Sequence, residues 1–218
     1  MQPLQILMRR LVPLLAVFVA VLPLPALAQM AALQEGNQYI RLKNPQPVET
    51  GKKIEVIEFF SYGCPHCGEL EPFLQGWIKT MPADVAFRRI PVMFQDRWVP
   101  LAKIYYTLEA LGEEGRLSPE VFSALHAKGQ SLWQDKTFFE WAASQGLDRK
   151  KVEDMYNSFG IGGKVNRARM AAQAYQVQSV PLVVVDGKYV SNKVSSHSAM
   201  PAVIDALVAK ARVERPKS

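Results

Sequence analysis

Two patterns of apolar and polar residues run along the chain, one typical of buried strands and the other of amphipathic helices. Residues 54–60 (IEVIEFF) are nearly all apolar, as in a strand buried on both faces. The dipeptide Asp186-Gly187 stands between two short apolar runs and favours a tight β-hairpin. The other segments with strand character are 39–42, 85–94, 181–185 and 188–190.

Apolar residues at helical spacing follow Cys64 and return in the middle and at the end of the chain. Pro65 suits the first turn of a helix, whose apolar face is expected to contain Leu70, Phe73, Leu74, Trp77 and Ile78. Between 95 and about 166 the period is helical throughout, and no strand is expected there. Further helices are expected before Val177 and from Met200 to Val213.

This order of elements predicts an α/β protein with a thioredoxin fold and a large all-helical insertion. Within the insertion, Ser118-Pro119 is typical of a helix start, Gly146 of a helix end, and Asp148 of an N-cap. The residues expected to face inward after Asp148 are Val152, Met155, Tyr156 and Phe159. The expected division is a thioredoxin-like domain of residues 29–94 and 167–218 and an insertion of residues 95–166.

The first 28 residues have the layout of a secretory signal peptide. Arg9 and Arg10 precede an apolar run, and the run ends in small residues at positions 26 and 28, as signal peptidase requires. The alternative is an uncleaved membrane anchor, but three prolines interrupt the run. We therefore expect cleavage after Ala28 and export of the remaining chain.

The charge of the chain argues against nucleic-acid binding. The sequence has 26 basic and 20 acidic residues, a net charge of +6, and loss of Arg9 and Arg10 with the signal peptide leaves +4. The basic residues are scattered, which is typical of a solvated surface. The length after cleavage suits one domain, alone or with a large insertion.

The chain has two cysteines, Cys64 and Cys67, in the sequence CPHC. A disulfide between them would close too short a loop to stabilise the fold much, so a chemical role is favoured. Cys64 is expected at a helix N-terminus, where backbone N–H groups favour its thiolate, and His66 adds positive charge beside it. Cys67 is expected one turn deeper and shielded from solvent. Because a stable thiolate is a good leaving group, this pattern is typical of an oxidant.

Glu58 and the histidines are further candidates for chemistry. Glu58 places a carboxyl group inside the apolar strand, where burial would raise its pKa and suit it to accept the proton of the deeper thiol. The alternative is a strand end that faces water. His126 and His197 do not stand at ligand spacing from the cysteines, so no metal site is expected.

The run from Glu58 to Cys67, with Val180-Pro181 more than a hundred residues later, resembles the DsbA family of bacterial periplasmic thiol:disulfide oxidases. The resemblance spans essentially the whole chain after the signal peptide. It implies that Cys64 forms the mixed disulfide with substrate and that Cys67 resolves it. It also implies a cis peptide bond between Val180 and Pro181, with the backbone of Val180 holding an extended substrate.

The resemblance further implies a catalytic centre that comprises Cys64, Pro65, His66, Cys67 and Glu58. In the family, the acid at the position of Glu58 pairs with a lysine on the next strand, and the matching position here holds Arg89. Arginine does not release its proton. The exchange of lysine for arginine therefore leaves Glu58 as the one member of the pair that could exchange a proton.

The function implied is a periplasmic, monomeric oxidase that donates its Cys64–Cys67 disulfide to newly exported, unfolded proteins with free thiols. A quinone-linked inner-membrane partner resembling DsbB would reoxidise it, and no diffusible cofactor is required. One alternative is an isomerase or reductase of the same fold, although such isomerases usually carry an N-terminal dimerisation domain. Another is a chaperone or binding module that uses the groove near Val180-Pro181 and keeps an unreactive disulfide.

Overall fold

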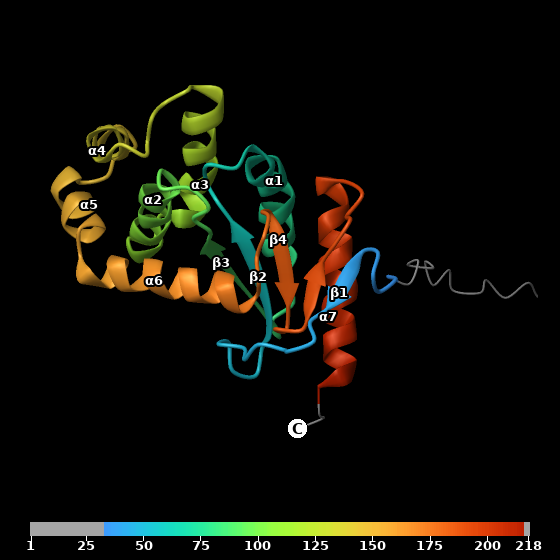
Figure 1. The fold of residues 1–218 in the computed structure, drawn as a ribbon. Coiled ribbons are helices and arrows are strands. Elements are labelled where there is room, and N and C mark those ends of the chain that lie inside the picture. Colours follow the sequence, from blue (N-terminus) through green and yellow to red (C-terminus); the bar gives the residue numbers. More distant parts are fainter. Residues whose placement is uncertain (1–32, 216–218) are drawn as a thin grey trace, which may run out of the picture. The chain divides into compact units, whose positions relative to one another are not determined.

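A five-stranded β-sheet lies at the centre of residues 33–215, the part of the chain that the computed structural model describes (Figure 1). The predicted signal peptide, residues 1–28, lies outside the described residues. The order of the strands in the sheet is β1-β5-β4-β2-β3. The strands are β1 (Tyr39–Arg41), β2 (Ile54–Phe60), β3 (Val85–Pro91), β4 (Leu182–Val185) and β5 (Tyr189–Ser191).

Strand β2 runs parallel to β3 and antiparallel to β4, and β4 continues into β5 through the predicted hairpin. Asp186 and Gly187 adopt positive φ angles of 55° and 62° at this turn, as the dipeptide favours. The five predicted strands are confirmed, but β3 ends at Pro91 rather than at residue 94. Its partner β2 ends at Phe60, which pairs with Pro91, so the following residues have no strand to pair with.

The helices agree with the predicted order, and no strand occurs between residues 95 and 166. They are α1 (Pro65–Thr80), α2 (Trp98–Ala110), α3 (Glu114–Phe122), α4 (Asp135–Ser144), α5 (Arg149–Tyr156), α6 (Phe159–Ala174) and α7 (Met200–Glu214). A π-helical turn η1 (Ser123–Ala127) extends α3, and a 3₁₀ turn η2 (His197–Ala199) precedes α7. Among the helices of residues 33–215, none combines the length and the apolar content needed to cross a lipid bilayer.

Helices cover both faces of the sheet (Figure 1). Val56 and Val183 pack with residues of α1 and α7 on one face. Ile57 and Val184 point the other way and pack with the cluster formed by α2 to α6. Every residue of β2 is buried, and apart from Glu55 and Glu58 its sequence is apolar without the alternation of a half-exposed strand.

Two local predictions in the insertion are wrong. Ser118-Pro119 lies inside α3, which begins at Glu114, because Ser118 is buried and its hydroxyl bonds to Tyr62 rather than capping a helix. Phe159 is 100% exposed, since α5 ends at Tyr156 and a new helix starts after Ser158, which breaks the helical period.

The other capping predictions are confirmed. Gly146 follows α4 with a φ of 87°, and the side chain of Asp148 accepts a hydrogen bond from the backbone N–H of Lys151 at the start of α5. The division into two domains stays a prediction. Helix α6 is continuous across the expected boundary at residue 166, so that boundary would fall inside a helix.

Candidate active site

Cys64 is the N-cap residue of α1, and Pro65 occupies the first turn, as predicted. The Cys64 Sγ lies 3.5 Å from the carbonyl oxygen of Val180, within hydrogen-bonding reach of a thiol. The peptide bond between Val180 and Pro181 is cis, and Pro181 directly precedes β4. The fold therefore brings the CPHC sequence and Val180-Pro181 together at the N-terminus of α1.

The environment of Cys64 favours its thiolate. A hydrogen bond from the Cys67 thiol is the largest influence, and although burial opposes it, the pKa of Cys64 is lowered to about 6. The backbone N–H groups of Cys67 and His66 and the charge of His66 act in the same direction. Cys64 is only 7% exposed, and the carbonyl oxygen of Val180 lies against its thiol.

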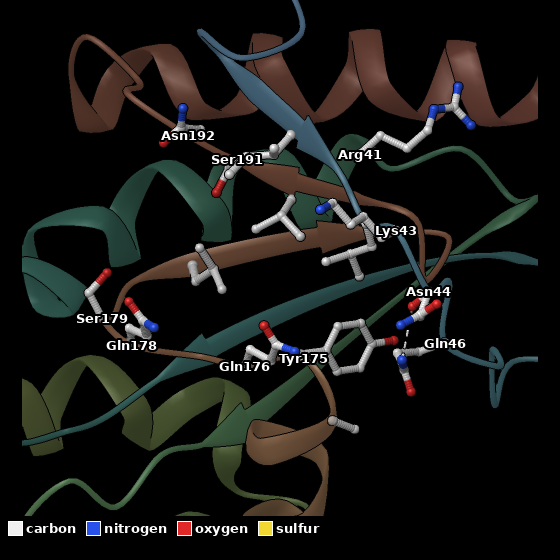
Figure 2. A pocket seen from close by; sticks show the side chains of 15 residues that line it. Arg41, Lys43, Asn44, Gln46, Tyr175, Gln176, Gln178, Ser179, Ser191 and Asn192 are labelled. Carbon is white, nitrogen blue, oxygen red and sulfur yellow. Dashed lines mark hydrogen bonds between the residues drawn. The ribbon is translucent and has the colours of Figure 1, made fainter.

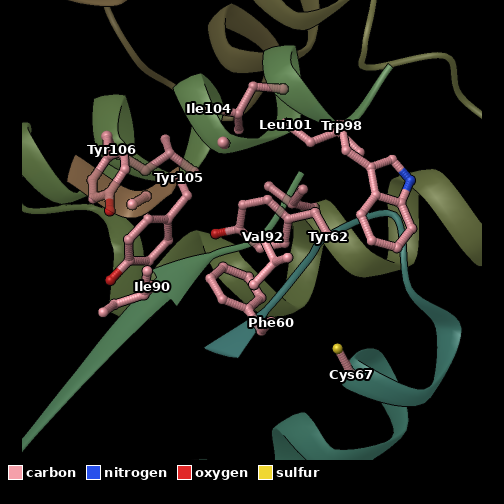
Figure 3. Packing of buried hydrophobic residues seen from close by; sticks show 14 of the residues in the cluster. Phe60, Tyr62, Cys67, Ile90, Val92, Trp98, Leu101, Ile104, Tyr105 and Tyr106 are labelled. Carbon is pink, nitrogen blue, oxygen red and sulfur yellow. The ribbon is translucent and has the colours of Figure 1, made fainter. Parts of the chain in front are cut away.

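Cys67 is fully buried, and burial raises the pKa of its thiol. The hydrogen bond to Cys64 and the negative charge of Glu58 raise the pKa of Cys67 further. Figure 3 shows Cys67 at the edge of the apolar cluster that includes Phe60 and Trp98. Both cysteines are free thiols in the structure. The two sulfur atoms thus differ sharply in access and in acidity.

His66 lies in the first turn of α1 and points toward solvent. Its Nδ1 is 2.9 Å from Oε2 of Glu69, and the hydrogen bond to Glu69 raises the pKa of His66. Nδ1 of His197 lies 3.5 Å from the same oxygen, and the two imidazole rings are 5.9 Å apart between centroids. Neither Glu69 nor this placement of His197 was predicted from the sequence. The spacing of His66 and Glu69 by three positions on one helix was the available signal.

Glu58 is buried and pairs with Arg89 on the neighbouring strand. The two residues face each other in the parallel register of β2 and β3, and Nε of Arg89 donates a 2.7 Å hydrogen bond to Oε2 of Glu58. The other two nitrogens of Arg89 donate to Glu71 at 2.6 Å and to Glu114 at 2.5 Å. One guanidinium therefore holds three carboxyl groups beneath the cysteines.

Burial raises the pKa of Glu58 to about 7, although the charge of Arg89 lowers it. The negative charges of Glu71 and Glu114 raise the pKa of Glu58 again. Burial is also the largest influence on Glu71, whose pKa is raised. Because one positive charge faces three carboxyl groups, the cluster favours retention of a proton near neutral pH. Glu71 and Glu114, which were not predicted from the sequence, come from α1 and α3.

The helical insertion fixes the loop that precedes Cys64. The hydroxyl of Tyr62 lies 2.6 Å from Oγ of Ser118, and Nε2 of His126 donates to the carbonyl oxygen of Tyr62 at 2.7 Å. A Cβ atom at Gly63 would collide with the indole of Trp98, so this position has room only for glycine. Figure 3 shows Tyr62 within the packed cluster and Trp98 at its edge. His126 thus has a backbone partner and does not approach the cysteines as a ligand.

A pocket of about 620 Å³ lies elsewhere, between β1, β5 and residues 174–179. Figure 2 shows Tyr175 and Ser179 on one side of it and Arg41 and Lys43 on the other. No residue of CPHC lines it. The thiol chemistry therefore belongs to the N-terminus of α1 and not to this pocket.

Comparisons with known proteins agree with this geometry. The family of DSBA-like thioredoxin domains matches residues 55–207. The thiol:disulfide interchange protein DsbA of Bordetella parapertussis is 39% identical over 182 residues, which cover 82% of this chain and 87% of that protein. The protein of the same name from Pseudomonas aeruginosa is 39% identical over 177 residues, which cover 79% and 84% of the two chains.

Solved structures of DsbA proteins share the fold. The crystal structure of Pseudomonas aeruginosa DsbA superimposes with a TM-score of 0.81 and 36% identity, over 85% of this chain and 97% of that one. Reduced DsbA1 from Neisseria meningitidis gives a TM-score of 0.77 and 30% identity, over 84% and 97% of the two chains. The predicted thioredoxin fold with helices inserted between its strands is confirmed.

Proposed function

This chain belongs to the family of DSBA-like thioredoxin domains and is a protein disulfide oxidoreductase, and from this premise we propose that it works as an oxidase. In this function it donates a disulfide between Cys64 and Cys67 to newly exported, unfolded proteins that carry free thiols. The disulfide itself is the redox group, and the proposal requires no diffusible cofactor.

One observation carries the proposal, namely the difference between the two thiols. The pKa of Cys64 is lowered to about 6, whereas Cys67 is fully buried and its pKa is raised. A sulfur that is stable as a thiolate is the better leaving group, and its stability lowers the free energy of the reduced protein. The reduced form is then favoured, so the oxidised form tends to give its disulfide away.

The proposed reaction is a pair of thiol–disulfide exchanges. A substrate thiolate attacks Sγ of Cys64, a substrate–Cys64 bond forms, the Cys64–Cys67 bond breaks, and Cys67 leaves as a thiolate. A second substrate thiolate then attacks the substrate sulfur of the mixed disulfide, and Cys64 leaves as a thiolate. The substrate loses two electrons and the enzyme gains them. If no second thiol is present, Cys67 attacks Cys64 and releases the substrate unchanged.

Glu58 is the proposed proton carrier for Cys67. A buried thiolate at Cys67 is costly, so it must take up a proton when the disulfide opens and lose it when the disulfide re-forms. Glu58 has a pKa near 7, and its charge acts directly on the pKa of Cys67. Arg89 keeps its proton, so it holds the carboxyl group in place without exchanging one. Glu58 would therefore give and accept the proton.

Val180 is the proposed anchor for the substrate main chain. It is half-buried, and its carbonyl oxygen stands next to Cys64 at the start of β4. An extended polypeptide bound through backbone hydrogen bonds there would place its sulfur beside Cys64 without dependence on its side chains. This arrangement suits unfolded substrates of many sequences, with Pro181 shaping the turn.

Turnover requires an oxidant for the dithiol, and we assign this role to a quinone-linked inner-membrane protein similar to DsbB. The proposal also includes cleavage of the signal peptide after Ala28, action in the periplasm, and a monomeric enzyme. The layout of residues 1–28 supports export. An oxidising compartment is where such a disulfide would persist.

The proposal is tested by mixing the oxidised protein with a reduced, unfolded protein that has two cysteines, without oxygen or glutathione. One substrate disulfide should form for each protein disulfide consumed. The Cys67→Ser variant, given a substrate with an intact disulfide, should accumulate a covalent complex through Cys64. The matched Cys64→Ser variant should accumulate none, because Cys67 is buried. Equal trapping by both variants would contradict the assigned roles.

The same assay separates the alternatives. An isomerase would restore a substrate with scrambled disulfides faster than it oxidises a reduced one. A chaperone with an unreactive disulfide would suppress aggregation of the substrate but transfer no disulfide to it. Transfer in proportion to the protein disulfide supports the oxidase over both.

A further inference from the structure

We propose that His66, Glu69 and His197 form a binding site for a divalent transition-metal ion, and that Zn²⁺ is the ion this ligand set fits. The three side chains offer one ligand atom each, and these atoms all lie within 4.8 Å of one another. The proposed site lies near the N-terminus of α1, where the side chains of His66 and Glu69 are exposed to solvent. It does not include Cys64 or Cys67.

Two separate elements build the site. His66 and Glu69 stand three positions apart in the first turns of α1, so their side chains lie on the same face of the helix. His197 comes from η2, the turn before α7, which packs against α1. A metal ion would therefore tie the beginning of α1 to the segment that leads into α7.

The observed distances match the spacing of ligands around a small metal ion. Nδ1 of His66 is 2.9 Å and Nδ1 of His197 is 3.5 Å from Oε2 of Glu69. In a tetrahedral zinc site with bonds of about 2.0–2.1 Å, neighbouring ligand atoms are about 3.3 Å apart. The two distances bracket this value, and the third pair, the two histidine nitrogens, lies within 4.8 Å. Rotation of the histidine side chains toward each other would complete the geometry.

The ligand types select among cations. Two imidazoles and one carboxylate are typical of zinc sites that keep a fourth position open, and copper and nickel accept the same ligands. Calcium and magnesium prefer oxygen ligands throughout and should bind poorly. The side chains of His66 and Glu69 are 69% and 56% exposed, so an ion can enter from solvent and keep a water molecule as its fourth ligand.

The expectation that the chain has no metal site rested on ligand sets that contain the cysteines. No regular spacing in the sequence links His197 to the first turn of α1, and only the fold brings them together. This site does not depend on the proposed oxidase function, because its ligands are present whether or not the disulfide transfers.

The test is a calorimetric titration of the oxidised protein with zinc chloride, since the disulfide removes both thiols as possible ligands. We expect one Zn²⁺ per chain. Glu69→Gln and His197→Gln should each weaken binding by at least about tenfold, the loss that even an outer-sphere partner can cause. The matched controls are His126→Gln and Glu140→Gln, which also remove one imidazole and one exposed carboxylate, and they should bind Zn²⁺ as the parent protein does.

A spectroscopic readout locates the ion. In NMR spectra of the imidazole groups, Zn²⁺ should shift the signals of His66 and His197 and leave those of His126 in place. Absence of binding to the oxidised protein, or equal affinity in the two ligand variants and the parent, would overturn the proposal. Binding only after reduction would also overturn it, because the cysteines would then be the ligands.

Discussion

Nε of Arg89 donates a 2.7 Å hydrogen bond to Oε2 of Glu58, and both side chains are almost completely buried. The same guanidinium also contacts Glu71 and Glu114, so one positive charge serves three carboxyl groups. A lysine ammonium is a point charge, whereas the planar guanidinium presents donors in several directions at once. The arginine at this position therefore holds a larger acidic cluster beneath the thiols than a simple ion pair would.

Replacement of Glu58 by glutamine should change how stability depends on pH. The folded protein keeps a proton on Glu58 up to about pH 7, whereas an ordinary glutamate releases it near 4.5. Stability from this group is therefore present below pH 4.5 and is lost as the pH rises to 7, because the folded state then binds more protons than the unfolded state. Above pH 7, Glu58→Gln should be more stable than the parent by on the order of 3 kcal/mol, because the pKa values in the two states differ by about 2.5.

The measurement is urea unfolding of the oxidised parent and variant at several pH values across this range. The two proteins should have similar stability at the acidic end and diverge toward neutral pH. Glu140→Gln, which removes an exposed carboxylate, should keep the parent profile. Parallel stability profiles for the parent and Glu58→Gln would show that the pKa of Glu58 is the same in the folded and unfolded protein.

Replacement of Arg89 by lysine should destabilise the protein although the charge is kept. One ammonium group cannot reach Glu58, Glu71 and Glu114 at once, so a buried carboxyl group would lose its partner. We expect a loss of about 1–3 kcal/mol in urea unfolding. The matched control is Arg149→Lys, because Arg149 and its partner Glu153 are both exposed to solvent. Equal losses in both variants would refute the special role of Arg89.

Replacement of His66 by alanine should raise the pKa of Cys64, since the charge of His66 lowers it. The equilibrium constant with glutathione should move toward the disulfide form of the protein by about two- to tenfold. Glu69→Gln should shift both quantities in the same direction but less, because Glu69 raises the pKa of His66. The readout is the ultraviolet absorbance of the thiolate against pH. If Cys64 titrates identically in all three proteins, His66 is a bystander.

Two glycine variants test whether the loop before Cys64 is held by the insertion. Gly63→Ala would place a methyl group against the Trp98 indole and should cost about 1–3 kcal/mol, with a change in tryptophan fluorescence. Gly76→Ala, inside α1 with open space around it, should instead stabilise the protein by about 0.5–1 kcal/mol. A tolerated alanine at position 63 would mean that Trp98 does not constrain the loop.

Local sequence signals predicted the parts of the site that local structure creates. The run of residues 54–60, the proline after Cys64 and the dipeptide Asp186-Gly187 each favour one conformation on their own, and the structure confirms all three. The place of Glu58 in an apolar strand favoured its burial, and the resemblance to the DsbA family implied its pairing with Arg89; the structure confirms both. These features depend on neighbours in sequence or on adjacent strands.

The features that the sequence did not predict arise from contacts between distant elements. Glu71 and Glu114 reach Arg89 from two different helices. Glu55, a second glutamate of the same strand as Glu58, is buried and pairs with Arg88. The approach of His197 to Glu69 depends on where η2 packs against α1. Such pairs leave no periodic mark in the sequence, so only the folded chain shows them.

The redox equilibrium of the protein with glutathione tests the central claim, that the stabilised thiolate of Cys64 makes this protein an oxidant. The protein is equilibrated in buffers of graded glutathione ratio, the thiols are trapped, and the reduced fraction is fitted. We expect a reduction potential less negative than about −200 mV, more oxidising than that of a typical glutaredoxin. A potential far below about −200 mV would contradict the claim, because the thiolate of Cys64 would then not stabilise the reduced form enough to make the protein an oxidant.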